Sequence, residues 1–332
     1  MRKILFALLL LPGLAHSQKV YNLDTVTISA TRLPVNISET GRNINILTAA
    51  DIQALPVKSI DELLRYLPGV EIQSRGPLGT QGDMIIRGST FTQVLVLIDG
   101  RRLNDPLTAH FNSYIPVSLA EIARIEVLKG PGSALYGADA VGGVVHIITK
   151  TFEDAAHQQG VSGKIGVGQH GLISGDFGGY YENEETRFSG GIVSNISDGF
   201  PREGGTPADF SINTGSFSVS KKLNDTWSAS GRLGIDYRDF DAQYYYTRSP
   251  ADQSRETVSS IWTQLGFEKR TEDFTARTDI SYKRTQDEFV FNPNFVSTNL
   301  HTTEYFNLLW NGELRINDQL SFGSGIQIDN RT

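Results

Sequence analysis

Apolar and polar residues alternate along the C-terminal half of the chain with the period of two that a β-strand imposes. Phe188 and Ile192 share one face of such a segment, and Ser189 lies on the other. The pattern predicts nine strands, near residues 161–169, 172–182, 185–198, 209–222, 225–239, 257–270, 273–288, 300–316 and 319–330. Many exceed the ~5–6 residues usual in soluble sheets and reach the about 9–11 residues that a tilted strand needs to cross a membrane.

The connections between these strands alternate in length. Short links fall near residues 183–184, 224–225, 271–272 and 317–318, and long links near 198–209, 240–256 and 289–299. Outer-membrane barrels are connected in this way, with tight periplasmic turns and long outer loops. The pattern favours a membrane barrel over the alternative, a soluble β-sandwich.

The first half mixes short helices with short strands. Residues 59–62 have the form of a capping box, and Leu63, Leu64 and Leu67 then share one face, which predicts a helix that Pro68 ends. Apolar or alternating runs predict strands at 70–73, 84–86, 94–98, 101–103, 121–128 and 143–149. We expect an α+β domain over residues 42–150, followed by the antiparallel sheet over residues 151–332.

The first seventeen residues have the features of an export signal. Arg2 and Lys3 precede the apolar run 4–11, and small residues around Ala15 match a cleavage site. The run is too short to cross a bilayer. Residues 1–17 are therefore predicted to be a signal peptide, and residues 18–41 a periplasmic N-terminal segment.

Composition excludes several classes of protein. The 332 residues include no cysteine, which excludes disulfides, thiolate metal sites and cysteine nucleophiles. A net charge of -7 argues against a nucleic-acid partner. The six histidines are scattered, and no phosphate-binding loop or zinc-protease motif occurs, so we predict no catalytic site and no enzyme.

A size estimate connects the two halves. Residues 42–150 folded as a globule would be roughly 34 Å across. Nine strands would close to a cylinder of only roughly 18 Å, whereas about 22 strands would give roughly 43 Å. If the first domain fills the barrel, this chain is an N-terminal fragment with about nine strands of an expected 22. A smaller barrel with the domain outside it is the alternative.

The chain resembles the TonB-dependent outer-membrane receptors, in which a plug domain fills a transmembrane β-barrel. Four segments match plug motifs in the family's order: residues 59–73 (SIDELLRYLPGVEIQ), 85–88 (IIRG), 94–104 (VLVLIDGRRLN) and 122–150 (IARIEVLKGPGSALYGADAVGGVVHIITK). The vitamin B12 receptor branch is nearest, also in residues 239–246 (DFDAQYYY). The resemblance implies an α+β plug domain followed by an incomplete antiparallel transmembrane β-barrel.

Residues 24–32 (DTVTISATR) are similar to the family's TonB box. The segment is β-prone and could add as a strand to a sheet edge of a partner. An ordinary first strand of the plug is the alternative. The predicted TonB-binding residues are Asp24, Thr25, Val26, Thr27, Ile28, Ser29 and Ala30.

The resemblance also implies a lock between plug and barrel. Arg87 matches one plug arginine of the family, and Lys129 stands where the family usually has another. Lysine cannot make the bidentate contact of arginine, and the answering glutamates would lie beyond these strands. His146 stands where asparagine is common, and we interpret it as a strand residue.

Ligand contacts are expected from the plug apex and the long outer loops. The candidates are Arg75, Phe91, His110, Phe111, Tyr114, Tyr244, Tyr245 and Tyr246. For the three tyrosines 244–246, an aromatic girdle at the membrane interface is the alternative. Asp236, Asp239 and Asp241 could hold Ca²⁺ through oxygen ligands, although a solvated loop would have the same composition.

The function that the resemblance implies is TonB-dependent uptake of a scarce metal chelate, either a ferric siderophore, haem or cobalamin, across the outer membrane. The expected partners are TonB, outer-membrane lipid and the chelate, with no nucleic acid, and the receptor is expected to be a monomer when full length. The alternative is a receptor that senses its ligand without transport. Only residues 18–23 separate the predicted cleavage site from the TonB box, which favours transport because signalling receptors of this family usually carry an extra domain there.

Overall fold

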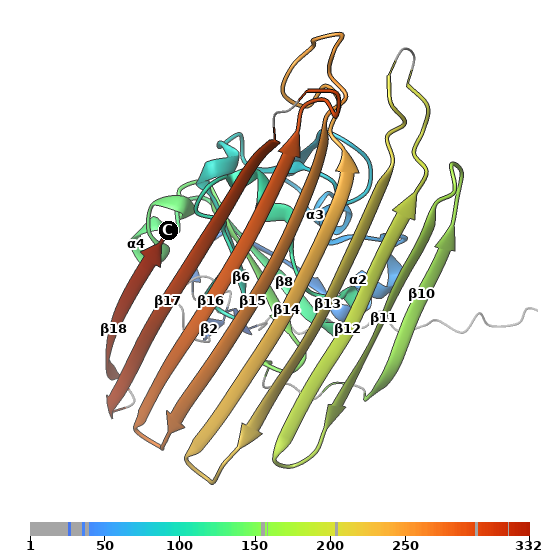
Figure 1. Cartoon of the computed structure of the whole chain (residues 1–332). Coiled ribbons are helices and arrows are strands. Elements are labelled where there is room, and N and C mark those ends of the chain that lie inside the picture. Colours follow the sequence, from blue (N-terminus) through green and yellow to red (C-terminus); the bar gives the residue numbers. More distant parts are fainter. Residues whose placement is uncertain are drawn as a thin grey trace, which may run out of the picture.

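The computed structural model describes residues 26–27, 35–36, 40–153, 157, 159–202, 205–295, 298–317 and 319–332. The predicted signal peptide and most of the segment 18–41 lie outside these residues. The described part forms a small mixed domain, the plug, and a large curved sheet, the wall (Figure 1).

The plug is built on a five-stranded sheet of order β3-β8-β9-β6-β7, in which β6 and β9 run parallel and the other pairs are antiparallel. Its strands are β3 (Ile44–Thr48), β6 (Val94–Ile98), β7 (Arg101–Arg102), β8 (Ile122–Lys129) and β9 (Gly143–Thr149). A separate hairpin pairs β4 (Val70–Ser74) with β5 (Gly82–Ile86). The helices are α2 (Ala49–Ala54), α3 (Ile60–Leu64), α4 (Ser133–Tyr136) and the short 3₁₀ turns η1 (Phe91–Gln93), η2 (Ala109–Ser113), η3 (Leu119–Glu121) and η4 (Ala138–Ala140).

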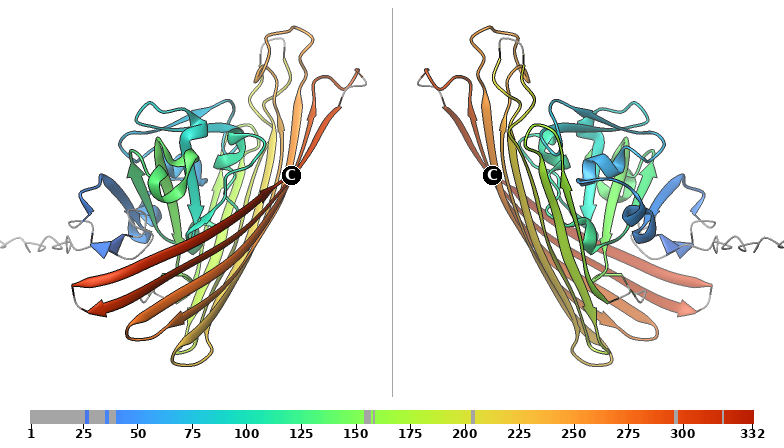
Figure 2. Two further views of the ribbon diagram at one scale, coloured as in Figure 1. Left: turned by 90° about the vertical axis from the view of Figure 1, so that its left-hand side faces the viewer. Right: turned by 90° about the vertical axis from the view of Figure 1, so that its right-hand side faces the viewer.

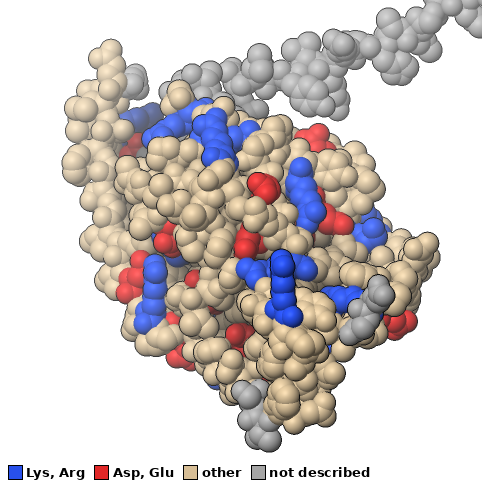
Figure 3. Space-filling view, turned by 90° about the horizontal axis from the view of Figure 1, so that it is seen from above, with Lys and Arg blue, Asp and Glu red and all other residues tan. Residues whose placement is uncertain are grey.

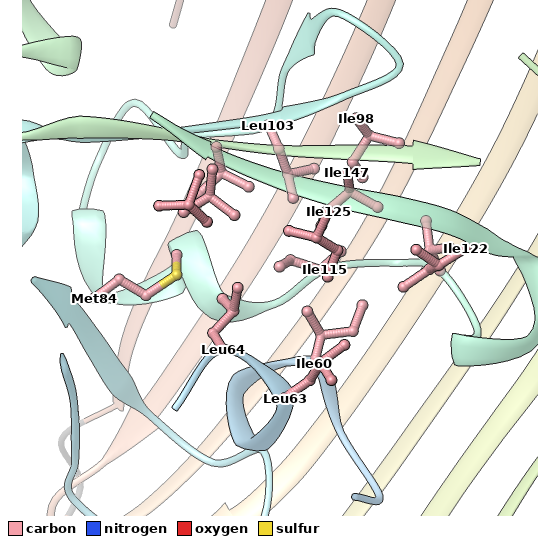
Figure 4. Close-up of a cluster of buried hydrophobic side chains, with 14 of the residues drawn as sticks. Ile60, Leu63, Leu64, Met84, Ile98, Leu103, Ile115, Ile122, Ile125 and Ile147 are labelled. Carbon is pink, nitrogen blue, oxygen red and sulfur yellow. The ribbon is translucent and has the colours of Figure 1, made fainter. Parts of the chain in front are cut away.

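The helix α3 packs its apolar side onto this sheet. Leu63 and Leu64 are fully buried and face Ile125 and Ile147 in the plug core (Figure 4). The predicted capping box forms only in part. Ser59 accepts the Glu62 N–H at 3.5 Å, but the Glu62 carboxylate accepts the Lys58 N–H at 2.8 Å instead of that of Ser59.

The wall confirms the nine predicted strands. They pair in sequence order and antiparallel throughout, with bounds β10 (Gly160–Val167), β11 (Ile173–Glu182), β12 (Thr186–Ser197), β13 (Phe210–Lys222), β14 (Trp227–Asp241), β15 (Arg255–Arg270), β16 (Phe274–Val290), β17 (Thr298–Asn317) and β18 (Leu320–Arg331). Within the described residues, β10 and β18 each pair with one neighbour only, so the barrel is incomplete.

The wall curves around the plug, which lies on its concave face (Figure 2). On the convex face large apolar side chains are exposed, among them Ile192 and Leu265. On the concave face polar side chains are buried against the plug, among them Ser189, Gln264 and Asp279. This is the inverse of a water-soluble sandwich and matches a barrel wall with an apolar lipid face. No helix among the described residues is long and apolar enough to cross a membrane.

Candidate ligand site and plug–wall interface

A buried ion pair joins the end of plug strand β6 to the wall. Asp99 follows β6 with a left-handed φ of 49°. Its Oδ2 accepts from Arg232 of β14 at 2.6 Å, and the two side chains are 1% and 0% exposed. Asp99 also accepts the Thr149 N–H at 2.8 Å, and Arg232 donates to the Thr149 hydroxyl at 2.6 Å. The plug and the wall therefore share one charged network.

A second buried charged group lies two strands further along the wall. Arg101 of β7 forms an ion pair with Asp279 of β16, and both side chains are almost fully buried. Lys283, four positions along β16 on the same face, donates to the Leu103 carbonyl at 3.0 Å and lies 3.7 Å from Asp105. Sequence reasoning did not predict these contacts between plug and wall.

Neutral and acidic groups hold the plug turn η3 to the wall. Asp176 of β11 accepts the Ser118 hydroxyl at 2.7 Å and the Leu119 N–H at 2.9 Å, and so caps η3 from outside the plug. Glu121 accepts from the hydroxyls of Ser216 and Ser189 on the wall. Burial raises the pKa of the Glu121 carboxyl, while the Arg232 charge lowers it by a smaller amount.

Glycines on the wall allow η3 to approach this closely. A Cβ built on Gly191 would lie 2.4 Å from the Ser118 Cβ, and one on Gly178 would lie 2.8 Å from the Ala120 Cβ. Neither distance is compatible with a side chain. The glycines of β11 and β12 therefore form a flat surface on which η3 rests.

The predicted lock residues Arg87 and Lys129 lie next to each other on the plug. Arg87 Nη1 donates to the Lys129 carbonyl at 3.4 Å. Burial, and then the Arg87 charge, lower the pKa of the Lys129 ammonium. Neither side chain forms an ion pair with a wall carboxylate within the described residues, so the lock stays a prediction.

Three predicted ligand contacts are packed between plug and wall. Phe111, Tyr114 and Tyr245 are 2%, 3% and 8% exposed and belong to one apolar cluster with Phe210 and Phe240 of the wall. They therefore anchor the plug apex here instead of presenting faces to a ligand. The sequence alone does not distinguish these buried residues from Phe91 and His110, because burial of a side chain at the plug apex depends on which wall residues lie opposite it.

Four other candidates come together on the exposed side of the apex. Phe91 stacks on His110, with ring centroids 4.5 Å apart and planes 20° from parallel. His110 Nδ1 lies 2.5 Å from Asp83 Oδ1, and Asp83 Oδ2 lies 3.6 Å from Arg75. The Arg75 guanidinium lies 5.3 Å from the centroid of the Tyr246 ring. We call this set of five residues the apex cluster.

The outer loop between β14 and β15 reaches down to the apex cluster. Gln81 of the plug donates to the Tyr246 hydroxyl at 2.6 Å, and Arg75 donates to the Tyr245 carbonyl at 2.7 Å. Tyr244 and Tyr246 keep 43% and 50% of their surface exposed. These two tyrosines remain candidates for ligand contacts. Gln81 ends the segment 75–81, which the sequence already indicates as part of the plug apex, and Asp83 is an addition that no sequence signal indicated.

The predicted Ca²⁺ site is not formed. Each of the three aspartates is paired with a different arginine, namely Asp236 with Arg238, Asp239 with Arg255 and Asp241 with Arg202. Within the part of the chain that the structure describes, no group of three or more His, Asp or Glu side chains is arranged to hold a metal ion. The guanidinium groups supply the positive charge that a bound cation would otherwise supply.

Seen from above, the plug and the surrounding wall carry basic and acidic side chains interspersed over the surface (Figure 3). No extended field of one sign is visible on this face. The charge distribution on this face therefore does not favour a strongly anionic ligand.

Two residues of the predicted TonB box are described. Val26 and Thr27 form β1, which pairs antiparallel with β2, Val35–Asn36. The other box residues, Asp24, Thr25, Ile28, Ser29 and Ala30, lie outside the described residues. This short strand pair agrees with the β-prone character of the segment. It does not test whether the segment binds TonB, which stays a prediction.

Comparison with known proteins identifies the family of the plug. The family described as TonB-dependent Receptor Plug Domain matches residues 36–144, which contain all the strands of the plug except β9, of which only the first two residues are matched. Residues 36–144 of the chain belong to this family. Its similarity to the vitamin B12 transporter BtuB of Vibrio vulnificus (strain CMCP6) is 31% identity over 227 residues, which cover 66% of this chain and 36% of that protein.

Other relatives extend the match across the wall. The vitamin B12 transporter BtuB of Vibrio cholerae serotype O1 is 28% identical over 331 residues, covering 94% of this chain and 51% of that protein. Among solved structures, the alcaligin outer membrane receptor FauA from Bordetella pertussis has a TM-score of 0.70 at 14% identity and covers 91% of this chain and 49% of its own.

The siderophore receptor PiuA from Acinetobacter baumannii has a TM-score of 0.64 at 16% identity, covering 91% of this chain and 47% of its own. At such identities the two structures show the fold alone. The chain spans about half the length, or less, of these two relatives. The relatives are named as transporters and receptors, which supports the prediction of a non-enzyme, and the family and fold indicate the outer membrane.

Proposed function

We propose that the protein takes up a scarce metal chelate across the outer membrane, with the plug gating the barrel lumen and TonB supplying the force. The ligand is a ferric siderophore, haem or cobalamin. The observation that carries the proposal is the polar interface between plug and wall. Asp99, Glu121 and Asp279 are buried in contacts that water can replace when the plug moves.

This interface suits a gate better than an apolar one would. Separating two apolar surfaces in water costs about 25 cal/mol per Å² with no compensation. A buried ion pair gives back part of its separation cost, because each charge regains its hydration. The Arg232–Asp99 pair and its neighbours can thus hold the plug closed and still release it under force.

The TonB box is the proposed point of attachment. Residues Asp24 to Ala30 would add as a strand to TonB, and tension on them would remodel the plug. The pairing of Val26–Thr27 with Val35–Asn36 supports a β-capable backbone here. TonB, the chelate and outer-membrane lipid are the proposed partners, and the receptor is proposed to work as an exported monomer.

Cobalamin is the first chelate to test, because the two relatives described above are named vitamin B12 transporters. Sensing without transport is the second candidate function. A sensor would bind the chelate and change transcription without accumulating it in the cell.

The test is uptake by cells that lack their own receptors and express the gene product. Cyanocobalamin, haemin and a ferric siderophore are supplied in parallel, and accumulation is measured in wild type, Thr27→Pro and the control Thr27→Val. Proline cannot donate to a strand ladder, whereas valine keeps the N–H and the β-propensity. We expect Thr27→Pro to bind one chelate like wild type and to accumulate none, and Thr27→Val to transport it.

Accumulation by Thr27→Pro at the wild-type rate would refute the TonB assignment. Wild-type binding of one chelate without accumulation would instead favour the sensing function.

A further inference from the structure

The outer loop between β12 and β13 is tied to the end of β14 by a buried ion pair. Arg202 of this loop pairs with Asp241, and the two side chains are 15% and 4% exposed. The Thr206 hydroxyl donates to the same carboxylate, and the Thr206 N–H donates to Gln243 Oε1 at 2.9 Å. A guanidinium, a hydroxyl and an N–H of one loop therefore converge on the next loop.

The same network continues into the two following outer loops. Gln243 Nε2 donates to the Asp252 carbonyl at 2.5 Å. The Asp252 carboxylate is fully buried and accepts the Tyr244 N–H at 2.9 Å. Asn292, in the loop between β16 and β17, donates to the Ala251 carbonyl at 2.6 Å. Three outer loops are thus joined into one hydrogen-bonded unit, and the Arg202–Asp241 pair is its first link.

A second arginine adds to the positive charge at this place. Arg255, at the start of β15, lies 2.9 Å from Asp209 and 2.5 Å from Asp239. Together with the Arg202–Asp241 pair, two arginines face three aspartates, and 2 − 3 gives a net charge of −1. The Arg255 side chain is 43% exposed, so water screens its pairs, and the more buried Arg202 contributes most of the ordering.

The third aspartate of the predicted Ca²⁺ site lies on the other side of β14. Side chains alternate along a strand, and Asp236 is an odd number of positions from Asp239 and Asp241. Asp236 is buried on the plug side, where its partner Arg238 donates to the Gly79 carbonyl of the plug. The predicted ligand set therefore does not fit one cation, and the described residues hold their own positive charges instead.

We propose that Arg202, assisted by Arg255, takes the place of a divalent cation in ordering the outer loops. Two guanidinium groups carry the same charge as one Ca²⁺, and arginine stays charged at any physiological pH. Because they belong to the chain, the loops keep their arrangement in medium that contains no Ca²⁺. Arg202 is thus a positioning residue for the outer loops, whichever chelate the protein takes up.

The substitution Arg202→Gln should exchange this internal charge for a need for Ca²⁺. One arginine would then face three aspartates, and 1 − 3 gives a net charge of −2, which a single Ca²⁺ balances. The buried Asp241 carboxylate would lose its partner, which is costly for a buried charge. The oxygens of Asp241, Thr206 and Gln243 that surround the pair are of the kinds that Ca²⁺ binds or tolerates.

The test is the distance between two spin labels on neighbouring outer loops, measured by pulsed electron paramagnetic resonance on the purified gene product. The labels are attached at Pro207→Cys and Gln253→Cys, which are both exposed, and the chain has no other cysteine. Distances are recorded with EDTA and with millimolar Ca²⁺ for the labelled parent, Arg202→Gln and the control Arg248→Gln. Arg248 is an exposed arginine of the same loops and forms no ion pair within the described residues.

We expect one narrow distance in the parent and in Arg248→Gln, with EDTA and with Ca²⁺ alike. Arg202→Gln should give a broad distribution with EDTA and a narrow one after Ca²⁺ is added. A parent that is broad with EDTA and narrow with Ca²⁺ would overturn the proposal, and so would a narrow distance in Arg202→Gln with EDTA. A distribution in Arg202→Gln that stays broad with Ca²⁺ would reject the exchange of arginine for a cation and leave Arg202 an ordinary structural residue.

Discussion

Replacing Asp99 with asparagine should loosen the plug from the wall. Asparagine tolerates the left-handed backbone and can still accept the Thr149 N–H, so the main change is the lost charge. Arg232 would then remain fully buried without its carboxylate, and within the described residues its Nε and Nη1 already lack hydrogen-bond partners. Removing one member of a buried pair costs about 3–5 kcal/mol.

The absence of cysteine makes this loosening measurable. Ser281 is 2% exposed, and its Oγ has no hydrogen-bond partner within the described residues. It lies on β16 between Asp279 and Lys283, which both contact the plug. A Ser281→Cys thiol should therefore react with a reagent only when the plug moves away, at a rate that follows the open population.

In the Ser281→Cys variant, Asp99→Asn should speed thiol labelling by about 100- to 5,000-fold. This factor corresponds to a loss of about 3–5 kcal/mol in the free energy of plug docking, at 1.36 kcal/mol for each factor of ten. Adding Arg232→Met should recover most of the loss, because no unpaired charge is left. Asp241→Asn is the matched control, since its partner Arg202 lies in an outer loop of the wall. Labelling of Asp99→Asn at the control rate would refute the assignment of this pair to plug docking.

Two further changes test the interface and the plug core. In the same thiol assay, Gly191→Ala should speed labelling about 5- to 150-fold, because its Cβ would meet Ser118 and overpacking costs about 1–3 kcal/mol. Gly231→Ala, with its nearest neighbour at 3.7 Å, should change little, and equal rates for the two would contradict the close-approach argument. Burial lowers the pKa of His146, whose Nε2 accepts the Gly100 N–H at 2.9 Å, below the ordinary 6.5. The unfolded chain then binds the proton first, so His146 should destabilise the plug as pH falls below about 6.5. Denaturant midpoints at pH 7 and pH 5 should differ less in His146→Asn than in wild type, and equal differences would reject this role.

The wall was predictable because its pattern is local. Each strand alternates within itself, as Phe188, Ser189 and Ile192 do, and the lipid and plug faces impose the same period on every strand. The plug helix was also predictable from its apolar face. The predicted capping box of this helix forms only in part, because the Glu62 carboxylate accepts the N–H of Lys58 and not that of Ser59.

The docking contacts were not predictable in the same way. Asp99 and Arg232 are 133 positions apart in the chain, and nothing beside either residue marks the other as its partner. The same holds at the apex, where Phe111 is buried by the wall and Phe91 is left to cover His110. The local sequence around these side chains does not determine whether they are buried, because their burial depends on wall strands that lie far along the chain.

The orientation of the wall is the claim on which the rest of the account depends. Along β15, Ile261 and Leu265 are exposed on the convex face, while Trp262 and Gln264 are buried against the plug. Single cysteines across residues 261–267, each carrying a fluorophore, should be quenched by a lipid-borne quencher at 261, 263, 265 and 267 and protected at 262, 264 and 266. Quenching from the lipid at the even positions, or from water at the odd ones, would contradict a plug seated inside a lipid-facing barrel.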